Sequence, residues 1–209
     1  MAYHIEVVDL NHLPPADTVL SEAERAFYQT LKLPKRQTEW LGGRLALKKL
    51  LCAYAGGALT DYTILAPGGV GKPSVTQGEN AVPIPFSLTH SNGFAAAVLA
   101  PQACSIGIDL EKIAPRIKAW SADFFHPSEL AAGEPSDDFL TQLWTQKEAL
   151  VKLLGSGLTV NSFDIRVVGG VPQFFGRALA IYNALGAPSL TLETLTLLPG
   201  FCCSVAVGA

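Results

Sequence analysis

Apolar runs and amphipathic helical patterns follow one another along this chain in an order that occurs twice. In the first half, the run over 5–10 predicts a short strand, and the Leu-, Ala- and Lys-rich stretch over 37–54 predicts the main helix. The runs over 84–89 and 94–100 predict a hairpin, because Asn92-Gly93 between them is a strong turn signal.

The second half repeats this succession. A strand is predicted over 105–111, a main helix over 137–154, and further strands near 163–168, 190–198 and 201–207. Helices mixed with sequence-adjacent hairpins favour an α+β fold over a wound parallel sheet. Each half is therefore expected to be an antiparallel sheet packed by helices.

Individual residues also recur in both halves in the same order. The matched landmarks are Asp9 with Asp109, Ser21-Glu22 with Ser128-Glu129, Trp40 with Trp144, and Phe94 with Phe201. They predict a pseudo-dimer of similar subdomains, 1–102 and 103–209, with a ligand site in the cleft between them. The same matching sets Arg44 opposite Glu148. It leaves three carboxylates only in the second copy, which predicts one active site per chain.

Composition narrows the class of protein. Of 209 residues, 49% are hydrophobic and 16% charged, as in a globular protein, and the net charge of −3 argues against nucleic-acid binding. No apolar run reaches the ~18 residues of a membrane span. The N-terminus has no basic segment followed by an apolar one, so a cytoplasmic location is expected.

Three carboxylates are the candidate chemistry of the second half. Asp109 and Glu111 share one face of a predicted strand, and Glu148 lies in the predicted helix over 137–154. Taken alone, a solvent-exposed strand end and a solvated helix face explain them equally well. As a group they form an all-oxygen donor set that suits Mg²⁺ or Mn²⁺ and not zinc. Lys147 and Lys152 would then neutralise phosphate charge.

The motifs of this chain, taken together, resemble those of the 4′-phosphopantetheinyl transferase superfamily, Sfp-type. The motifs are Gly71-Lys72-Pro73, Phe86-Ser87-Leu88-Thr89-His90-Ser91, Gly107-Ile108-Asp109-Leu110-Glu111, Phe124-Phe125 with Glu129, and Trp144-Thr145-Gln146-Lys147-Glu148-Ala149-Leu150-Val151-Lys152. The alanine after Glu148 places the chain among the W/KEA variants. The resemblance implies a pseudo-dimer that holds coenzyme A between its halves.

The resemblance also implies roles for residues. Mg²⁺ on the pyrophosphate of coenzyme A would be held by Asp109, Glu111 and Glu148. Contacts to coenzyme A would come from Arg44, Lys72, Thr89, His90, Lys147 and Lys152. Catalytic roles would fall to Glu129, Glu148 and Lys152. Glu129 matches a proposed general base, and Glu148 acting through a metal-bound water is the alternative proton acceptor.

The function implied by the resemblance is a holo-[acyl-carrier-protein] synthase activity. The enzyme would transfer the phosphopantetheine arm of coenzyme A to a serine of an acyl or peptidyl carrier protein and release 3′,5′-ADP. It would work as a monomer, without nucleic-acid or membrane partners. Two alternatives remain open from the sequence. One is another Mg²⁺-dependent enzyme acting on a pyrophosphate, and the other is a non-catalytic coenzyme A-binding protein.

Overall fold

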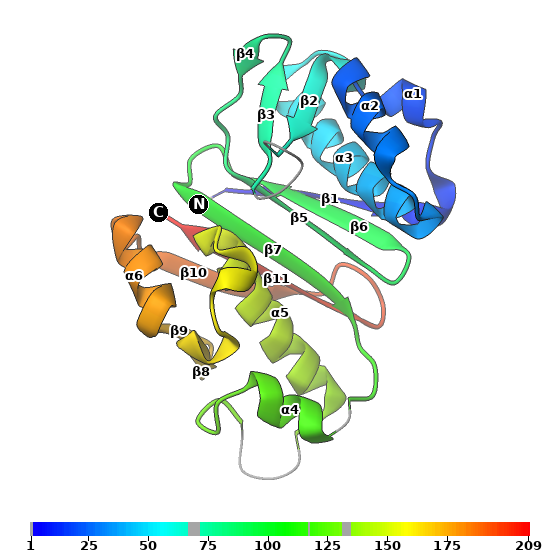
Figure 1. The fold of residues 1–209 in the computed structure, drawn as a ribbon. Coiled ribbons are helices and arrows are strands. Elements are labelled where there is room, and N and C mark those ends of the chain that lie inside the picture. The colour runs from blue at the N-terminus through cyan, green and yellow to red at the C-terminus, as the bar shows by residue number, and fades with distance from the viewer. Residues whose placement is uncertain (1, 67–71, 117, 131–134) are drawn as a thin grey trace. The chain divides into compact units, whose positions relative to one another are not determined.

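The computed structural model describes residues 2–66, 72–116, 118–130 and 135–209. The chain divides into two units, Ala2–Pro101 and Gln102–Ala209, each with its own hydrophobic core (Figure 1). The sequence predicts a boundary one residue later, between 102 and 103.

The N-terminal unit is built on an antiparallel sheet with the strand order β1-β6-β5. Its strands are β1 (His4–Asp9), β5 (Phe86–Ser91) and β6 (Phe94–Leu99). The long helix α3 (Pro34–Ala55) packs on this sheet and carries many of the buried leucines of the core. Helix and hairpin both lie where the hydrophobic pattern predicts them.

Short elements complete the N-terminal unit. They are α1 (Ala16–Val19), α2 (Glu22–Thr30), β2 (Tyr62–Leu65), β3 (Ser74–Gln77) and β4 (Asn80–Ala81). Strands β2, β3 and β4 form a separate antiparallel sheet in that order. Helix α2 begins with a capping box, in which Ser21 and Glu24 satisfy each other's backbone N–H groups.

The C-terminal unit is built on a second antiparallel sheet, with the strand order β10-β11-β7. Its strands are β7 (Ser105–Lys112), β10 (Leu190–Leu195) and β11 (Phe201–Gly208). Helix α5 (Asp137–Leu154) packs on β7 and β11. It spans the predicted residues and ends at Gly155, whose φ of +65° is a left-handed conformation that glycine adopts at low cost.

The remaining elements of this unit are α4 (Lys118–Phe124), α6 (Gly176–Ala184) and the hairpin of β8 (Ile165–Val168) and β9 (Val171–Phe174). The prediction of an α+β fold with two helix-packed antiparallel subdomains is confirmed. None of the helices in the described parts of the chain is both long and apolar enough to cross a bilayer.

Strand register defines how the two units correspond. Asp9 pairs with the first residue of β6, and Lys112 pairs with the first residue of β11. Glu6 and Asp109 each pair with the fourth residue of that central strand, Ala97 and Ser204 respectively. The structural counterpart of Asp109 is therefore Glu6. The sequence matching of Asp9 with Asp109 is wrong by three positions. It relied on the similar residues around the two aspartates, which lie at different positions of the strand register.

Candidate active site

One face of β7 carries the first two carboxylates. Asp109 and Glu111 lie two residues apart in the strand, and their side chains point to the same side. Gly107 shares that face, and α5 packs against it. A Cβ added at Gly107 would lie 1.9 Å from the backbone oxygen of Ala149. The acidic pair therefore begins where strand and helix approach most closely.

Lys152 of α5 reaches across this contact. Its Nζ donates to Asp109 Oδ1 at 2.7 Å and to the backbone oxygen of Ile108 at 2.9 Å. The Lys152 side chain is 28% exposed and that of Asp109 only 7%. The ammonium thus holds the buried carboxylate in place while part of it stays accessible to a bound anion.

Glu148 lies one helical turn before Lys152 and is coupled to the same group. Burial raises the pKa of Glu148 above its ordinary value, the charge of Asp109 raises it further, Lys152 opposes this, and Glu111 adds to it. The three carboxylates therefore act as one electrostatic group. Ionising Glu148 within it is unfavourable unless a cation lies close by.

The donor set matches a hard divalent cation in kind. All three side chains offer carboxylate oxygens, which Mg²⁺ and Mn²⁺ prefer. Across the ranges that the structure describes, no three His, Cys, Asp or Glu side chains already converge into a metal cage. The acidic group fits a cation through its chemistry and its mutual repulsion. Its side chains would still have to turn inward to enclose one.

The N-terminal unit has an ion pair at the equivalent place. Lys49 Nζ donates to Glu6 Oε1 at 2.8 Å, and Glu6 is the counterpart of Asp109. Lys49 in turn corresponds to Glu148, because each follows a lysine with the same kind of partner. Lys48 pairs with the buried Glu24, and Lys147 pairs with the buried Glu129. The oppositely charged Glu6 and Lys49 of the N-terminal unit thus correspond to the two carboxylates Asp109 and Glu148 of the C-terminal unit. The sequence matching of Arg44 with Glu148 and of Trp40 with Trp144 is therefore wrong.

Glu129 and Lys147 form a buried ion pair away from solvent. Lys147 Nζ donates to Glu129 Oε2 at 2.9 Å and to the backbone oxygen of Phe124 at 2.8 Å. Glu129 also accepts from the backbone N–H groups of His126, at 2.8 Å, and Val167, at 2.9 Å. A carboxylate that is 0% exposed and holds three donors is poorly placed to take a proton from a substrate.

Two assignments from the sequence are affected. The described contacts make Glu129 a buried partner of Lys147, and its role as a general base stays a prediction. Lys147 has a side chain that is 2% exposed, and it does not present its ammonium to a phosphate. Burial lowers the pKa of Lys147, while the hydrogen bond and charge of Glu129 raise it. The sequence pattern placed both residues beside Glu148 but carried no information on their burial.

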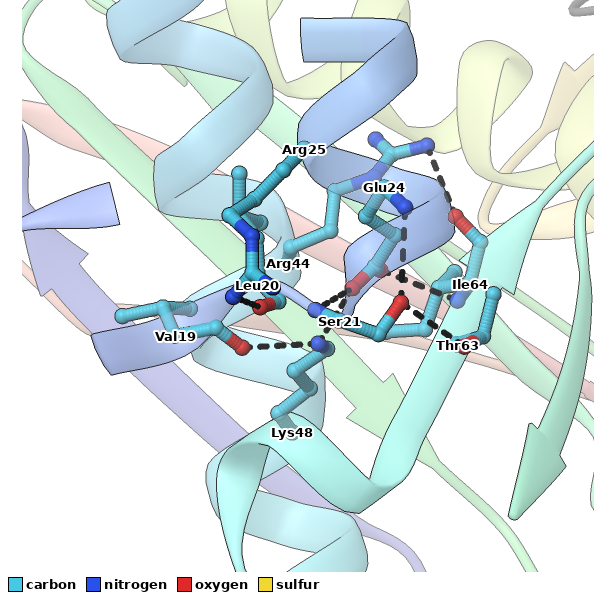
Figure 2. Close-up of polar contacts among 9 residues, drawn as sticks. All are labelled: Val19, Leu20, Ser21, Glu24, Arg25, Arg44, Lys48, Thr63 and Ile64. Carbon is cyan, nitrogen blue, oxygen red and sulfur yellow. Dashed lines mark hydrogen bonds and ion pairs between the residues drawn. The ribbon is translucent and has the colours of Figure 1, made fainter. Parts of the chain in front are cut away.

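The same network stands in the N-terminal unit (Figure 2). Lys48 Nζ forms a close ion pair with Glu24 Oε2 and donates to the backbone oxygen of Val19 at 2.8 Å. Glu24 accepts from the backbone N–H groups of Ser21 and Ile64, both at 2.9 Å. Glu24 therefore corresponds to Glu129, in place of the Glu22 that the sequence matching indicated.

Arg44 is the best-defined candidate of the N-terminal unit. Its guanidinium carbon lies 3.9 Å from the centroid of the Trp40 ring, and its Nη2 donates to the backbone oxygen of Ile64 at 3.4 Å. Burial lowers its pKa to about 10, an effect that Glu24 opposes and Arg36 adds to, so Arg44 is still a cation at neutral pH. Stacking on Trp40 sets the position of the Arg44 guanidinium, which is therefore a positive charge held in a fixed place.

The other predicted contacts from the N-terminal unit lie in β5 and just before β3. His90, in β5, places Nδ1 3.8 Å from Glu39 Oε1, with 40% of its side chain exposed. Thr89 is only 5% exposed, so its hydroxyl is not offered at the surface. Lys72 is exposed just before β3, and Gly71 of its motif lies outside the described residues.

The sequence did not lead us to predict the packing role of Gly107 or the Glu6–Lys49 pair. Gly107 had a visible signal, because a glycine within an apolar strand often marks close backbone approach. The Glu6–Lys49 pair had none, since its partners are 43 positions apart.

Comparison with known proteins finds similarity to one family. Residues 105–189 match the model of the 4′-phosphopantetheinyl transferase superfamily. That segment contains the acidic group and Lys152, which the structure brings together. The resemblance predicted from the sequence motifs is confirmed.

Several curated relatives carry the same name. A Synechocystis protein provisionally named a 4′-phosphopantetheinyl transferase is 29% identical over 70% of this chain, and the match spans 61% of that relative's length. A 4′-phosphopantetheinyl transferase of Salmonella typhimurium is 27% identical over 78% of this chain and 75% of its own. One of Bacillus subtilis is 32% identical over 49% of this chain and 50% of its own.

Proposed function

With its C-terminal unit a member of the 4′-phosphopantetheinyl transferase superfamily, we propose that this chain transfers the 4′-phosphopantetheine group of coenzyme A to a serine of an acyl or peptidyl carrier protein. The observation that carries the proposal is the acidic group of β7 and α5 with Lys152 beside it, within the segment that matches the family. The activity is that of a holo-[acyl-carrier-protein] synthase, and the protein acts as a cytoplasmic monomer.

Asp109, Glu111 and Glu148 are the residues that would hold Mg²⁺ or Mn²⁺ on the pyrophosphate of coenzyme A. When bound there, a divalent cation supplies positive charge that stabilises the negative charge developing on phosphate oxygens. The raised pKa of Glu148 and the Lys49–Glu6 pair at the equivalent place support this assignment. Both indicate that Lys152 balances the negative charge of the acidic group only in part.

The reaction is a phosphoryl-type group transfer. The serine oxygen of the carrier forms a bond to the β-phosphorus of coenzyme A, and the bond from that phosphorus to the bridging oxygen breaks. The bridging oxygen leaves with 3′,5′-ADP. Lys152, which is partly exposed and fixed by Asp109, stabilises charge on the phosphate oxygens.

The serine proton goes to Glu148 in this mechanism. Glu148 lies one helical turn from Lys152, beside the phosphate that Lys152 would stabilise, so its carboxylate is placed to accept that proton. The buried ion pair of Glu129 with Lys147 supports Glu148 over Glu129 as the acceptor. In the N-terminal unit, Arg44, Lys72 and His90 contact the nucleotide end of coenzyme A, where fixed cations suit its phosphates.

The test is to incubate the protein with coenzyme A, Mg²⁺ and an apo carrier protein, and to weigh the carrier by mass spectrometry. The expected result is a mass gain of one phosphopantetheine group, with 3′,5′-ADP released in equal amount. A panel of fatty-acid, polyketide and nonribosomal-peptide carriers identifies the preferred acceptor. Nucleotide release without carrier modification would overturn the proposal.

Variants connect the activity to the site. Asp109→Asn and Glu148→Gln should each lower kcat on the order of 10²-fold or more, because each removes charge needed around the phosphate. Asp123→Asn, at an exposed position of α4, is the matched control and should leave kcat unchanged. Full activity in both site variants would show that the metal site is misassigned.

A further inference from the structure

Two buried ion pairs, one in each unit, have the same set of contacts. In both, the lysine Nζ donates to the carboxylate and to a backbone oxygen, namely that of Val19 for Lys48 and that of Phe124 for Lys147. In both, one carboxylate oxygen accepts from the backbone N–H three residues earlier, and the other accepts from a β-strand N–H. Figure 2 shows these contacts for the N-terminal pair.

Each pair joins three pieces of its unit. In the N-terminal unit, Glu24 and Lys48 tie the start of α2 to β2 and to the main helix α3. In the C-terminal unit, Glu129 and Lys147 tie the segment after α4 to β8 and to the main helix α5. All four side chains are at most 2% exposed.

The N-terminal unit shows this network at a place without the three carboxylates. Its lysine is followed by Lys49, which pairs with Glu6, so an ion pair stands where the C-terminal unit has the acidic group. The network nevertheless persists there with every contact in place. Its contacts therefore do not depend on a substrate or on a neighbouring metal site.

We propose that Glu129 and Lys147 are positioning residues that fix the rotation of α5, so that Glu148 faces Asp109 and Glu111. Successive residues of a helix point about 100° apart. Once Lys147 is fixed to Glu129 and Phe124, the direction of Glu148 is therefore set as well. Neither member of the pair contacts the substrate. The inference deepens the proposed function, on which it rests.

The test compares Glu129→Gln/Lys147→Met with the matched control Glu24→Gln/Lys48→Met. Each double variant removes both charges together, so that no lone charge stays buried. The first readout is the melting temperature without metal. The second is the further rise in melting temperature when Mg²⁺ is titrated in the presence of coenzyme A, which reports binding without any turnover. The third is kcat and the KM for the carrier.

We expect both double variants to lose a similar number of degrees in melting temperature without metal. Only the C-terminal variant should require more Mg²⁺ for half of the stabilisation, by about 10- to 100-fold, as when a residue supporting a metal ligand is lost. Its kcat at low Mg²⁺ should fall correspondingly and recover at high Mg²⁺, with an unchanged KM for the carrier. Loss of a general base would give a deficit that Mg²⁺ does not rescue.

Two results would overturn the inference. The first is wild-type Mg²⁺ dependence in the C-terminal double variant together with a loss of kcat of ~10²–10⁴-fold, which would make Glu129 the general base. The second is an equal shift in Mg²⁺ dependence in the N-terminal control. If a double variant does not fold, Glu129→Asp and Glu24→Asp, which keep both charges and shorten the carboxylate, give the same comparison. Wild-type protein that binds Mg²⁺ with coenzyme A but modifies no carrier overturns the proposed function alone, and the binding comparison still decides the positioning role.

Discussion

The carboxylate of Glu148 is held where its own charge is disfavoured. Burial and the charges of Asp109 and Glu111 all raise its pKa, and Lys152 offsets them only in part. An ordinary protein surface would place such a side chain in water or beside a cation of its own. The arrangement sacrifices stability in the metal-free protein, which is expected of a site prepared for a charged ligand.

Glu148→Gln should therefore stabilise the metal-free protein at neutral pH. Because the folded-state pKa is raised, the folded protein binds more protons than the unfolded chain above pH 4.5, the ordinary value. The stability of the wild type thus falls as pH rises from 4.5 through the raised pKa, and the glutamine variant lacks this loss. Melting temperatures across this range in EDTA test the prediction. An advantage of the variant that shrinks as pH rises would contradict it.

Gly107→Ala should destabilise the protein by about 1–3 kcal/mol, as overpacking does. The added methyl group would meet the backbone of α5, at 1.9 Å from Ala149 O and 2.6 Å from Leu153 N, and backbone cannot rotate away. Activity should fall as well, because α5 carries Glu148 and Lys152. Gly43→Ala is the control: its nearest new neighbour is a Leu88 carbon at 3.9 Å, and alanine favours the helix. Urea denaturation of both variants measures the difference, and equal stabilities would refute the packing argument.

At the scale of elements, the hydrophobic pattern predicted what is long or periodic. Helices α3 and α5 and the central hairpins lie where the apolar spacing placed them. The sheet of β2, β3 and β4 was missed, because strands of two to four residues give too short a run to show a period. The residue-by-residue matching of the two halves was wrong where similar short sequences lie at different positions in the strand register. That register depends on pairing partners distant in the sequence.

Breaking one of the buried ion pairs should cost far more than removing it whole. Lys48→Met leaves Glu24 charged and 0% exposed, which is expected to cost about 3–5 kcal/mol. Adding Glu24→Gln removes that lone charge and should recover part of the loss. Lys49→Met, which affects only a half-exposed pair, is the control and should cost ~0.2–1 kcal/mol. Chemical denaturation of the three variants gives the free energies of unfolding. A double variant less stable than Lys48→Met would show that the hydrogen bonds of Glu24 outweigh its charge.

At the scale of the whole molecule, the two related units carry different charges where Glu6 pairs with Lys49. Glu6 with Lys49 makes a neutral pair, whereas Asp109 with Glu148 makes an acidic one. The sequence indicated the three carboxylates and the duplication, and so predicted a single active site. It could not indicate that the first copy replaces a carboxylate by an ammonium, because that equivalence follows from strand register and from the buried lysines.

Exchanging these charges between the units gives the sharpest prediction about the duplication. Glu148→Lys would recreate in the C-terminal unit the pair that Lys49 makes with Glu6, since Asp109 stands where Glu6 stands. Transfer should fall on the order of 10²-fold or more. The melting temperature should stay at or above that of the wild type, because the acidic group gains a second cation besides Lys152. Lys49→Glu should do the reverse, with a slightly lower melting temperature and unchanged kcat, since the N-terminal pair holds no ligand. Carrier modification assays and thermal melts on both variants test this prediction. A large loss of kcat in Lys49→Glu would mean that the N-terminal pair takes part in the reaction. The chemistry would then not be limited to the C-terminal unit.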